Sequence, residues 1–156
     1  MINTPSAPIN SFRTEVRPND IPAVKRLVLE TGFFSEEELA IAIELVEETL
    51  TLGAASGYSF LIIDDEQNTD QIMAYSCYGA IPAQPSCFDL YWIAVPPQHQ
   101  GRGLGSQLLI ETEHRVVAAG ASLLFIETSG RELYKPTRGF YEAHGYVCKE
   151  IIKDYY

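Results

Sequence analysis

The chain has 156 residues, of which 46% are apolar and 21% charged, as in an ordinary globular protein. This length suits a single domain, which we expect over residues 11–156. Residues 1–10 are polar and contain proline, so we expect them to form a flexible N-terminal arm. No apolar run approaches the roughly 20 residues of a membrane-spanning helix. The N-terminus has no basic segment that leads into an apolar one, as a signal peptide would. We therefore predict a cytoplasmic protein with no membrane partner.

The formal net charge is −10, from 11 basic and 21 acidic residues. Such an excess repels nucleic acid and anionic membranes, so we expect neither as a partner. It suits a cationic or amine-bearing substrate, although solubility alone also explains an acidic surface. Cys77, Cys87 and Cys148 lack metal-ligand spacing. We expect them to be reduced thiols that pack as small apolar residues, with no metal site.

Hydrophobic periodicity predicts a short strand and two helices at the start of the chain. Asn19 or Asp20 is expected to cap the first helix, and Ser35 opens the second with a capping box to Glu38. Both helices end at a glycine. The strand and the two helices are expected at residues 12–16, 20–32 and 35–53.

The period then changes from 3.6 to 2, which predicts strands. Pro82 and Pro85 are expected to break the chain between the second and third of them. Strands are predicted at residues 58–63, 72–78, 88–95, 123–127 (buried) and 146–152, with helices at 104–119 and 138–143. This order predicts an α/β (α+β) fold, in which a mixed, mostly antiparallel sheet has helices on both faces.

Three alternating glycines follow the strand that ends at Val95. They stand in the sequence Gln100-Gly101-Arg102-Gly103-Leu104-Gly105, which runs directly into an amphipathic helix. Glycines let a backbone approach a bulky ligand closely, and the amides of a helix N-terminus favour an anion. Arg102 adds a positive charge in an acidic protein. Together these features indicate a diphosphate site.

Two other glycine-rich loops fit less well. A P-loop requires Gly-Lys-Ser/Thr, and the segment Gly105-Ser106-Gln107 has no lysine. A dinucleotide fingerprint requires a third glycine where Ser106 stands. It also requires that the strand before the loop open a parallel βαβ unit, whereas this strand follows two predicted antiparallel ones.

The loop and two flanking segments resemble the GNAT family of N-acetyltransferases. Gln100, Gly103 and Gly105 match the family's acetyl-CoA loop, Gln/Arg-x-x-Gly-x-Gly/Ala. The segment 89–95 resembles the family's fourth strand, and 138–146, with its Phe-Tyr pair before Gly-Tyr, resembles the C-terminal helix. These matches occur in the family's order and cover nearly the whole chain.

The resemblance implies a donor site for acetyl-CoA. The fourth strand would splay from the fifth, so that backbone groups at its end bind the pantetheine arm and polarise the thioester oxygen, while loop amides hold the pyrophosphate. The residues implied are Ile93, Ala94 and Val95 for the arm, and Gln100, Gly101, Arg102, Gly103, Leu104, Gly105 and Ser106 for the pyrophosphate.

The implied reaction is the direct attack of a primary amine, of a small molecule or peptide, on the thioester. Tyr141 is the implied acid that protonates the departing thiolate. Glu127 and Asp89 are both candidates for the base that accepts the amine's proton. Glu127 is expected to be partly buried at the end of its strand, which would raise its pKa.

The acceptor pocket is expected between the two early helices and the adjoining strands. Aromatic side chains would form its wall, and Tyr134 would lie on the loop before the last helix together with Pro136 and Thr137. The substrate residues are Phe33, Tyr75, Tyr78, Tyr91 and Tyr134, although half of these tyrosines could equally belong to the core.

The sequence departs from the family at its C-terminus. Members usually close with one more strand, whereas this chain stops soon after Ile152, so the final strand is short or missing. An uncovered sheet edge invites pairing with another chain, which makes a homodimer possible. The alternative functions are a sensor that binds acyl-CoA without turnover and a protein scaffold that binds no coenzyme.

Overall fold

The computed structural model describes residues 12–128 and 132–148. Contacts divide the chain into two compact units, the first ending at Phe125 and the second beginning at Ile126. The predicted arm at residues 1–10 lies outside the described residues, and the single domain over residues 11–156 stays a prediction.

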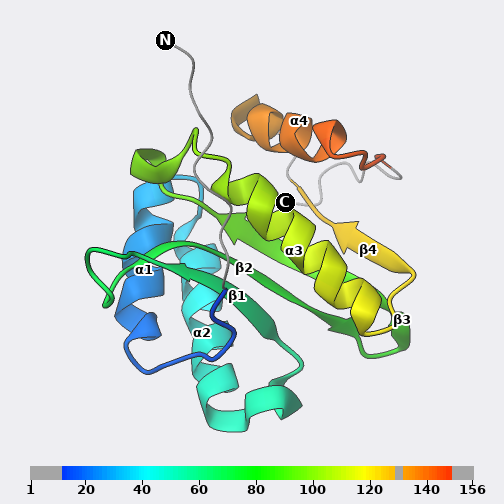
Figure 1. Ribbon diagram of the computed structural model, residues 1–156, viewed down its shortest axis with the longest axis horizontal. Helices are drawn as coiled ribbons and strands as arrows, with labels where there is room; N and C mark the ends of the chain where they lie inside the picture. Colours follow the sequence, from blue (N-terminus) through cyan, green and yellow to red (C-terminus); the bar gives the residue numbers. More distant parts are fainter. Residues whose placement is uncertain (1–11, 129–131, 149–156) are drawn as a thin grey trace. The chain divides into compact units, whose positions relative to one another are not determined.

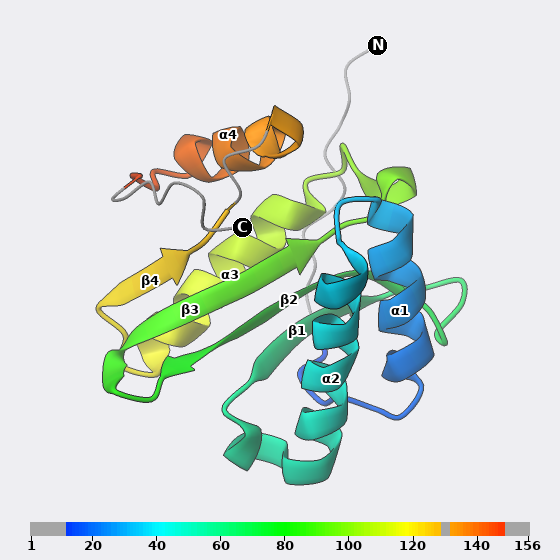
Figure 2. The same cartoon turned by 180° about the vertical axis from the view of Figure 1, so that it is seen from behind.

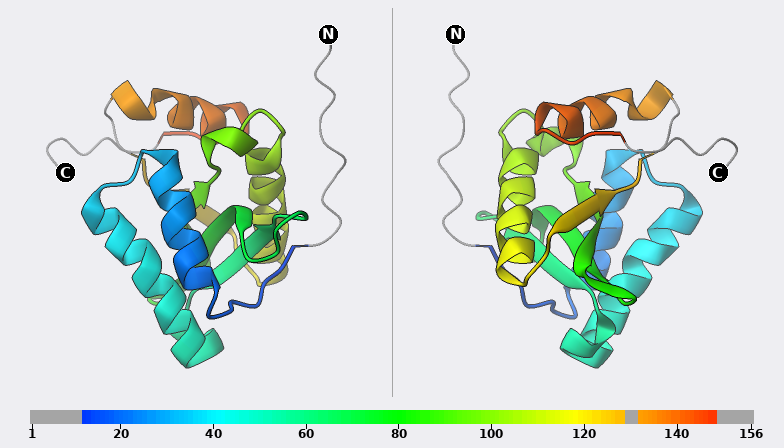
Figure 3. Two further views of the ribbon diagram at one scale, coloured as in Figure 1. Left: turned by 90° about the vertical axis from the view of Figure 1, so that its left-hand side faces the viewer. Right: turned by 90° about the vertical axis from the view of Figure 1, so that its right-hand side faces the viewer.

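The first unit is built on an open sheet with the strand order β1-β2-β3-β4 (Figure 1). Strands β1 (Ser59–Asp64), β2 (Ile72–Ile81) and β3 (Gln84–Ala94) are antiparallel neighbours. Helices α1 (Asp20–Thr31) and α2 (Glu36–Leu52) cover one face, and α3 (Leu104–Ala118) covers the other (Figures 2 and 3). The predicted class, a mixed sheet with helices on both faces, is confirmed.

The predicted strand at residues 12–16 is wrong. Only Arg13 pairs with the sheet, through an isolated bridge to Ile62. The Arg13 guanidinium donates to both carboxylate oxygens of Asp20 at 2.8 Å and to those of Asp64 at 2.7 and 2.8 Å. A further bond to the Glu15 carbonyl holds the bend at which the chain leaves the sheet. This clamp ties the segment to α1 and β1 and replaces a strand pairing.

The caps of the two helices differ from each other. Asn19 occupies the N-cap position of α1 as predicted, but its amide donates to Asp70 and makes no cap bond. At α2 the predicted capping box is present, because Ser35 and Glu38 exchange side-chain-to-backbone bonds of 3.1 and 3.0 Å. The core between these helices and the sheet includes Val24, Leu27, Val28, Ala42, Val46, Phe60, Ile62, Tyr75 and Cys77.

Pro82 separates two strands as predicted, whereas Pro85 does not break the chain. Ile81 pairs with Gln84, so Pro82 lies in a tight turn and Pro85 stands near the start of β3. Strands β2 and β3 therefore form one long hairpin. Pro85 is tolerated there because a proline lacks only its own N–H donor, and strand starts are the usual place for it.

Helix α3 packs on the sheet through Leu104, Leu108, Leu109 and Val116, all buried. A buried hydrogen bond of 3.0 Å joins Thr112 to Ser76 of β2. It satisfies both hydroxyls where water is excluded and fixes which side chains of β2 face α3.

The strand predicted at residues 123–127 is β4 (Leu123–Ile126), and it is not buried. Leu123 and Phe125 are 53% and 40% exposed. The reason is that β4 is the last strand of the sheet in the described part of the chain and has four residues against eleven in β3. The Ser122 N–H donates to the Ser86 carbonyl at 2.7 Å, so β4 starts level with the start of β3.

The second unit contains η3 (Glu132–Tyr134) and α4 (Lys135–Ala143). The helix begins three residues earlier than predicted, so Pro136 and Thr137 lie in its first turn rather than on a loop. Its end is the predicted glycine cap. Gly145 has φ 90°, and the N–H groups of Gly145 and Tyr146 donate to the carbonyls of Glu142 and Tyr141, which is a Schellman motif.

Of the last predicted strand, at residues 146–152, only residues 146–148 are described, and they do not form a strand. The rest lies outside the described residues. Of the three cysteines, Cys77 and Cys87 are buried as predicted, while Cys148 is exposed. Burial raises the pKa of the Cys77 thiol, so it stays protonated at neutral pH.

Candidate functional site

The glycine loop joins β3 to α3 through a short helical turn, η2 (Pro97–His99). Gly101 and Gly103 both adopt the left-handed conformation, with φ 78° and 77°. A Cβ atom at Gly101 would meet no other atom within 4 Å. The positive φ therefore requires glycine, while the space above the loop stays open for a ligand.

The loop ends at the N-terminus of α3. Gly103 is the N-cap residue, and the first intrahelical bond runs from the Gln107 N–H to the Gly103 carbonyl at 3.0 Å. The amides of Leu104 and Gly105 precede that bond and lie at the positive end of the helix dipole. An anion that approaches the open side of the loop meets these donors.

Two side chains support the same loop. The Gln100 amide donates to the Val95 carbonyl at 3.0 Å and closes the turn after β3. Arg102 is exposed, and its guanidinium lies 3.2 Å from Nδ1 of His99. A pyrophosphate fits this arrangement, because the loop offers open space, helix-terminal amides and a guanidinium.

A β-bulge interrupts β3 before the loop. Cys77 of β2 lies opposite Trp92, but the next residue, Tyr78, lies opposite Leu90, so Tyr91 is an extra residue. A bulge re-aims the side chains next to it. Both Tyr91 and Trp92 consequently pack at the edge of the core under α1 and α2, and both stay half-exposed.

Trp92 is held from two sides. Its indole N–H donates to the Tyr75 hydroxyl at 2.7 Å, and its ring meets Phe34 edge-on at a centroid distance of 5.6 Å. Tyr75 is fully buried, and burial raises the pKa of its phenol, so the hydroxyl stays neutral. The indole therefore has a fixed orientation immediately before Ile93, where the implied coenzyme strand begins.

The two candidate bases lie in different surroundings. Asp89 is half-buried two residues before the bulge, opposite Gly79, and burial raises its pKa. Glu127 lies one residue beyond β4 and is exposed, so the partial burial predicted for it is wrong. The cause is that β4, the last strand of the sheet in the described residues, is short and its own side chains are exposed or half-exposed. Of the two carboxylates, only Asp89 has the desolvated position that a general base requires.

Tyr141 belongs to the second unit and is 8% exposed. Its ring meets Phe140 at 5.2 Å and Tyr146 at 5.9 Å, both edge-on. Burial raises the pKa of Tyr141 to about 12. The phenol therefore keeps its proton at neutral pH, as a hydrogen-bond donor or acid must.

The predicted acceptor wall is not one surface. Tyr75 is a core residue, and Tyr78 faces α3, where Arg115 lowers and burial more strongly raises the pKa of its phenol. Phe33 and Tyr91 are half-exposed in the first unit, while Tyr134 ends η3 in the second. The structure also brings Tyr58 and Trp92 next to Tyr91. The sequence did not single them out, because the bulge that re-aims the β3 side chains has no sequence signal.

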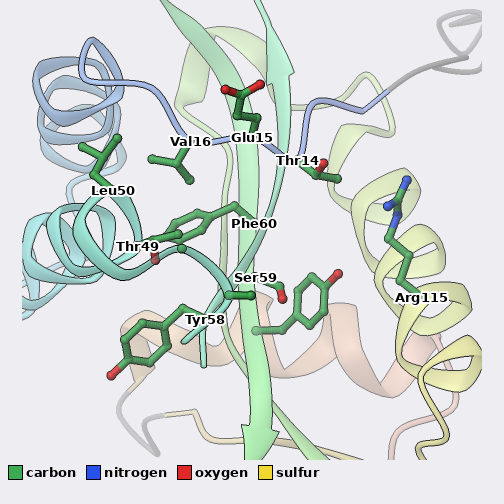
Figure 4. Close-up of a pocket in the computed structure, with 12 residues that line it drawn as sticks. Thr14, Glu15, Val16, Thr49, Leu50, Tyr58, Ser59, Phe60 and Arg115 are labelled. Atoms are coloured by element: carbon green, nitrogen blue, oxygen red, sulfur yellow. The ribbon is translucent and has the colours of Figure 1, made fainter. Parts of the chain in front are cut away.

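A separate open cavity of about 510 Å³ lies beside the outer edge of β1 (Figure 4). It opens where the chain bends away from β1 at Glu15. Val16, Leu50 and Phe60 lie on one side of it, and Arg115 lies on the other. The coenzyme loop contributes none of its lining, so this cavity is not the diphosphate site.

Residues 12–128 and 132–148 hold no group of three or more His, Cys, Asp or Glu side chains that could bind a metal ion. In the same residues, none of the helices has the length and apolarity needed to cross a membrane.

Comparisons with known proteins identify the family of this chain. Residues 56–148 match the family model of the acetyltransferase (GNAT) domain. A GNAT-family protein from Desulfovibrio desulfuricans is 46% identical, with a TM-score of 0.88 over 94% of this chain and 90% of that one. A comparison with curated proteins gives no match.

Two more distant structures share the fold. The PaiA N-acetyltransferase from Thermoplasma acidophilum, in complex with coenzyme A, has a TM-score of 0.71 at 15% identity and covers 92% of this chain and 94% of its own. The aminoglycoside N-acetyltransferase AAC(6')-Iy, in complex with CoA, has a TM-score of 0.65 at 15% identity, covering 94% and 98%.

The chain belongs to the GNAT acetyltransferase family, since the family model matches more than half of it. It is therefore an acyl-CoA-dependent N-acetyltransferase.

Proposed function

We propose that the protein transfers the acetyl group of acetyl-CoA to a primary amine of a small molecule or peptide, by direct attack of the amine. The observation that carries this proposal is the loop at residues 100–106. Its positive-φ glycines leave open space in front of the first amides of α3. Those amides and Arg102 would hold the pyrophosphate, and the backbone of residues 93–95 would hold the pantetheine arm.

The donor supplies an activated acyl group, and the protein positions and deprotonates the amine. Backbone N–H groups near Ile93 would polarise the thioester oxygen. Strand β3 continues beyond the four residues of β4, which supports the availability of its outer edge there.

Asp89 is the proposed base. An ammonium cannot attack a carbonyl, so its proton must pass to an acceptor, directly or through water. The half-buried position of Asp89 and its raised pKa bring its basicity closer to neutral pH. Glu127 is the second candidate, although its exposure gives it less support.

Tyr141 is the proposed acid. Because its pKa is raised to about 12, it remains protonated and can donate to the departing thiolate. Tyr141→Phe is expected to lower kcat by about 10²-fold, the lower end for acid–base catalysis, without loss of coenzyme binding.

The acceptor class draws support from AAC(6')-Iy, whose complex with a bisubstrate analogue of CoA and acetylneamine has the same fold. The test is thiol release from acetyl-CoA with a panel of primary amines, using the wild type and Tyr141→Phe. Stabilisation of the protein by acetyl-CoA, with no thiol release for any amine, would contradict the proposal and indicate a sensor.

The location of the coenzyme has its own control. Acetyl-CoA at 100 times its Kd should stabilise the wild type by about 2.7 kcal/mol. Gly103→Val should remove this stabilisation. Gly120→Val is the matched variant, since Gly120 also has a positive φ, 97°, and open space around it, but lies at the far end of α3. A shift that persists in Gly103→Val would mean that the site lies elsewhere.

A further inference from the structure

Four half-exposed aromatic rings form a continuous row along the side of the sheet that α1 and α2 cover. The ring centroids of Phe34 and Trp92 are 5.6 Å apart, those of Trp92 and Tyr91 6.4 Å, and those of Tyr91 and Tyr58 5.7 Å. We call these four residues the aromatic row. Phe34 lies in the segment before α2, Tyr91 and Trp92 lie at the bulge in β3, and Tyr58 is the residue before β1.

The row crosses a strand. Tyr58 precedes β1 and Tyr91 belongs to β3, with β2 between them. The two rings can meet because β2 has Gly79 at this level, so no side chain separates them. The Gly57 carbonyl and the Tyr91 ring lie where a Gly79 side chain would stand. The row is therefore built by the fold and is not a chance gathering of surface tyrosines.

Carboxylates lie beside the Tyr91 and Tyr58 part of the row. Asp89 lies beside Tyr91. Burial raises the pKa of the Tyr58 phenol, and the nearby charges of Glu48 and Glu44 of α2 raise it further. None of these three carboxylates forms an ion pair with any residue in the ranges 12–128 and 132–148. On the other side of Tyr91, Trp92 is followed along the chain by Ile93 and then by the coenzyme loop.

Aromatic faces next to unpaired carboxylates recognise organic cations, because the rings attract positive charge and cover the alkyl chain. We propose that the acceptor is a linear diamine or polyamine, with its reacting amine near Asp89 and its second ammonium over Tyr58, facing Glu48. Tyr58 is then a specificity-determining residue. This inference rests on the proposed acetyl transfer and names its substrate class.

The reaction is unchanged by the second ammonium. The near amine loses a proton to Asp89, directly or through water, and its nitrogen forms a bond to the acetyl carbon. The carbon–sulfur bond breaks, and the coenzyme leaves as a thiol. The far ammonium keeps its proton and charge, so it contributes only to binding.

The test compares three acceptors of similar length: cadaverine, n-pentylamine and δ-aminovalerate. They end in an ammonium, a methyl group and a carboxylate, so only the far group differs. With the wild type and acetyl-CoA, kcat/KM for cadaverine should exceed that for pentylamine by about tenfold or more. The carboxylate should be the poorest acceptor, because it faces Glu44 and Glu48.

Variants locate the effect. Tyr58→Leu should lower the cadaverine-to-pentylamine ratio about 5- to 30-fold through KM, whereas Tyr58→Phe keeps a ring and should retain it. Glu48→Gln should lower the ratio as well. Glu37→Gln, an exposed glutamate in the first turn of the same helix, is the matched control and should leave the ratio as it is.

Equal rates with cadaverine and pentylamine, a preference for δ-aminovalerate, or an unchanged ratio in Tyr58→Leu would each overturn the inference. Acetyl transfer to other amines, with none of these three accepted, would also overturn it. In all these cases the proposed acetyl transfer itself would stand. If no amine at all caused thiol release, that result would instead reject the proposed function itself.

Discussion

The coenzyme loop and the aromatic row are specified by different parts of the chain. The loop consists of backbone: two positive-φ glycines, the first amides of α3 and one arginine. The row consists of side chains from three separate elements, brought together by one extra residue in β3 and one glycine in β2. A backbone site depends on local sequence, and a side-chain site depends on register. The donor side of this fold can therefore stay the same while the acceptor side changes.

The largest expected effect comes from Asp89→Asn, at the acceptor end of this comparison. Loss of the general base should lower kcat/KM by about 10²- to 10⁴-fold while acetyl-CoA still stabilises the protein. A base works deprotonated, so wild-type kcat/KM should fall as the pH drops through the pKa of Asp89. Because burial raises that pKa, the fall should begin above the ordinary range of an aspartate, about 4.

The pH profile of the variant completes this test. Asp89→Asn should lose the acidic limb that the wild type shows. If the variant keeps both the rate and the limb, the base is another group, and Glu127→Gln is the next variant to measure.

A smaller effect is expected from Gly79→Ala, which tests whether the fold builds the row. A methyl group at this buried site would collide with the Gly57 carbonyl, so we expect a loss of about 1–3 kcal/mol in denaturant unfolding. KM for the amine should also rise, with coenzyme binding intact. Gly139→Ala in α4 meets no atom within 4 Å and should cost nothing. Equal stability of the two variants would contradict the close approach.

The smallest effect is expected from Arg102→Gln on the donor side. Removal of one exposed guanidinium should weaken acetyl-CoA binding by about 5- to 10-fold and reduce its salt dependence. Titration calorimetry at two ionic strengths measures both. Arg26→Gln changes an exposed arginine of α1 that pairs with Glu30, and it should leave the affinity unchanged. Identical affinities in both variants would exclude Arg102 from the phosphate site.

The sequence predicts local features well, because their signals are local. The capping box at Ser35, the glycine loop before α3 and the glycine cap at Gly145 each depend on residues within a few positions of one another. Helices and the long strands follow from periodicity in the same way.

The errors concern features that depend on distant partners. The segment at residues 12–16 reads as a strand, but the Arg13 clamp to Asp20 and Asp64 bends it away from the sheet. The bulge at Tyr91 is defined by its register against β2 and leaves no mark in the β3 sequence. The burial predicted for Glu127 came from the apolar strand that it follows, but β4 is an edge strand of the described sheet, and Glu127 is exposed.

The hydrogen bond between Trp92 and Tyr75 has a practical consequence. Trp92 is the one tryptophan among 156 residues, and it is the member of the aromatic row that directly precedes Ile93. Its emission therefore comes from a single, rigidly oriented indole whose outer side is open to solvent. The protein carries its own optical probe where the proposed donor and acceptor sites meet, and neither labelling nor engineering is needed to follow the order in which the two substrates bind.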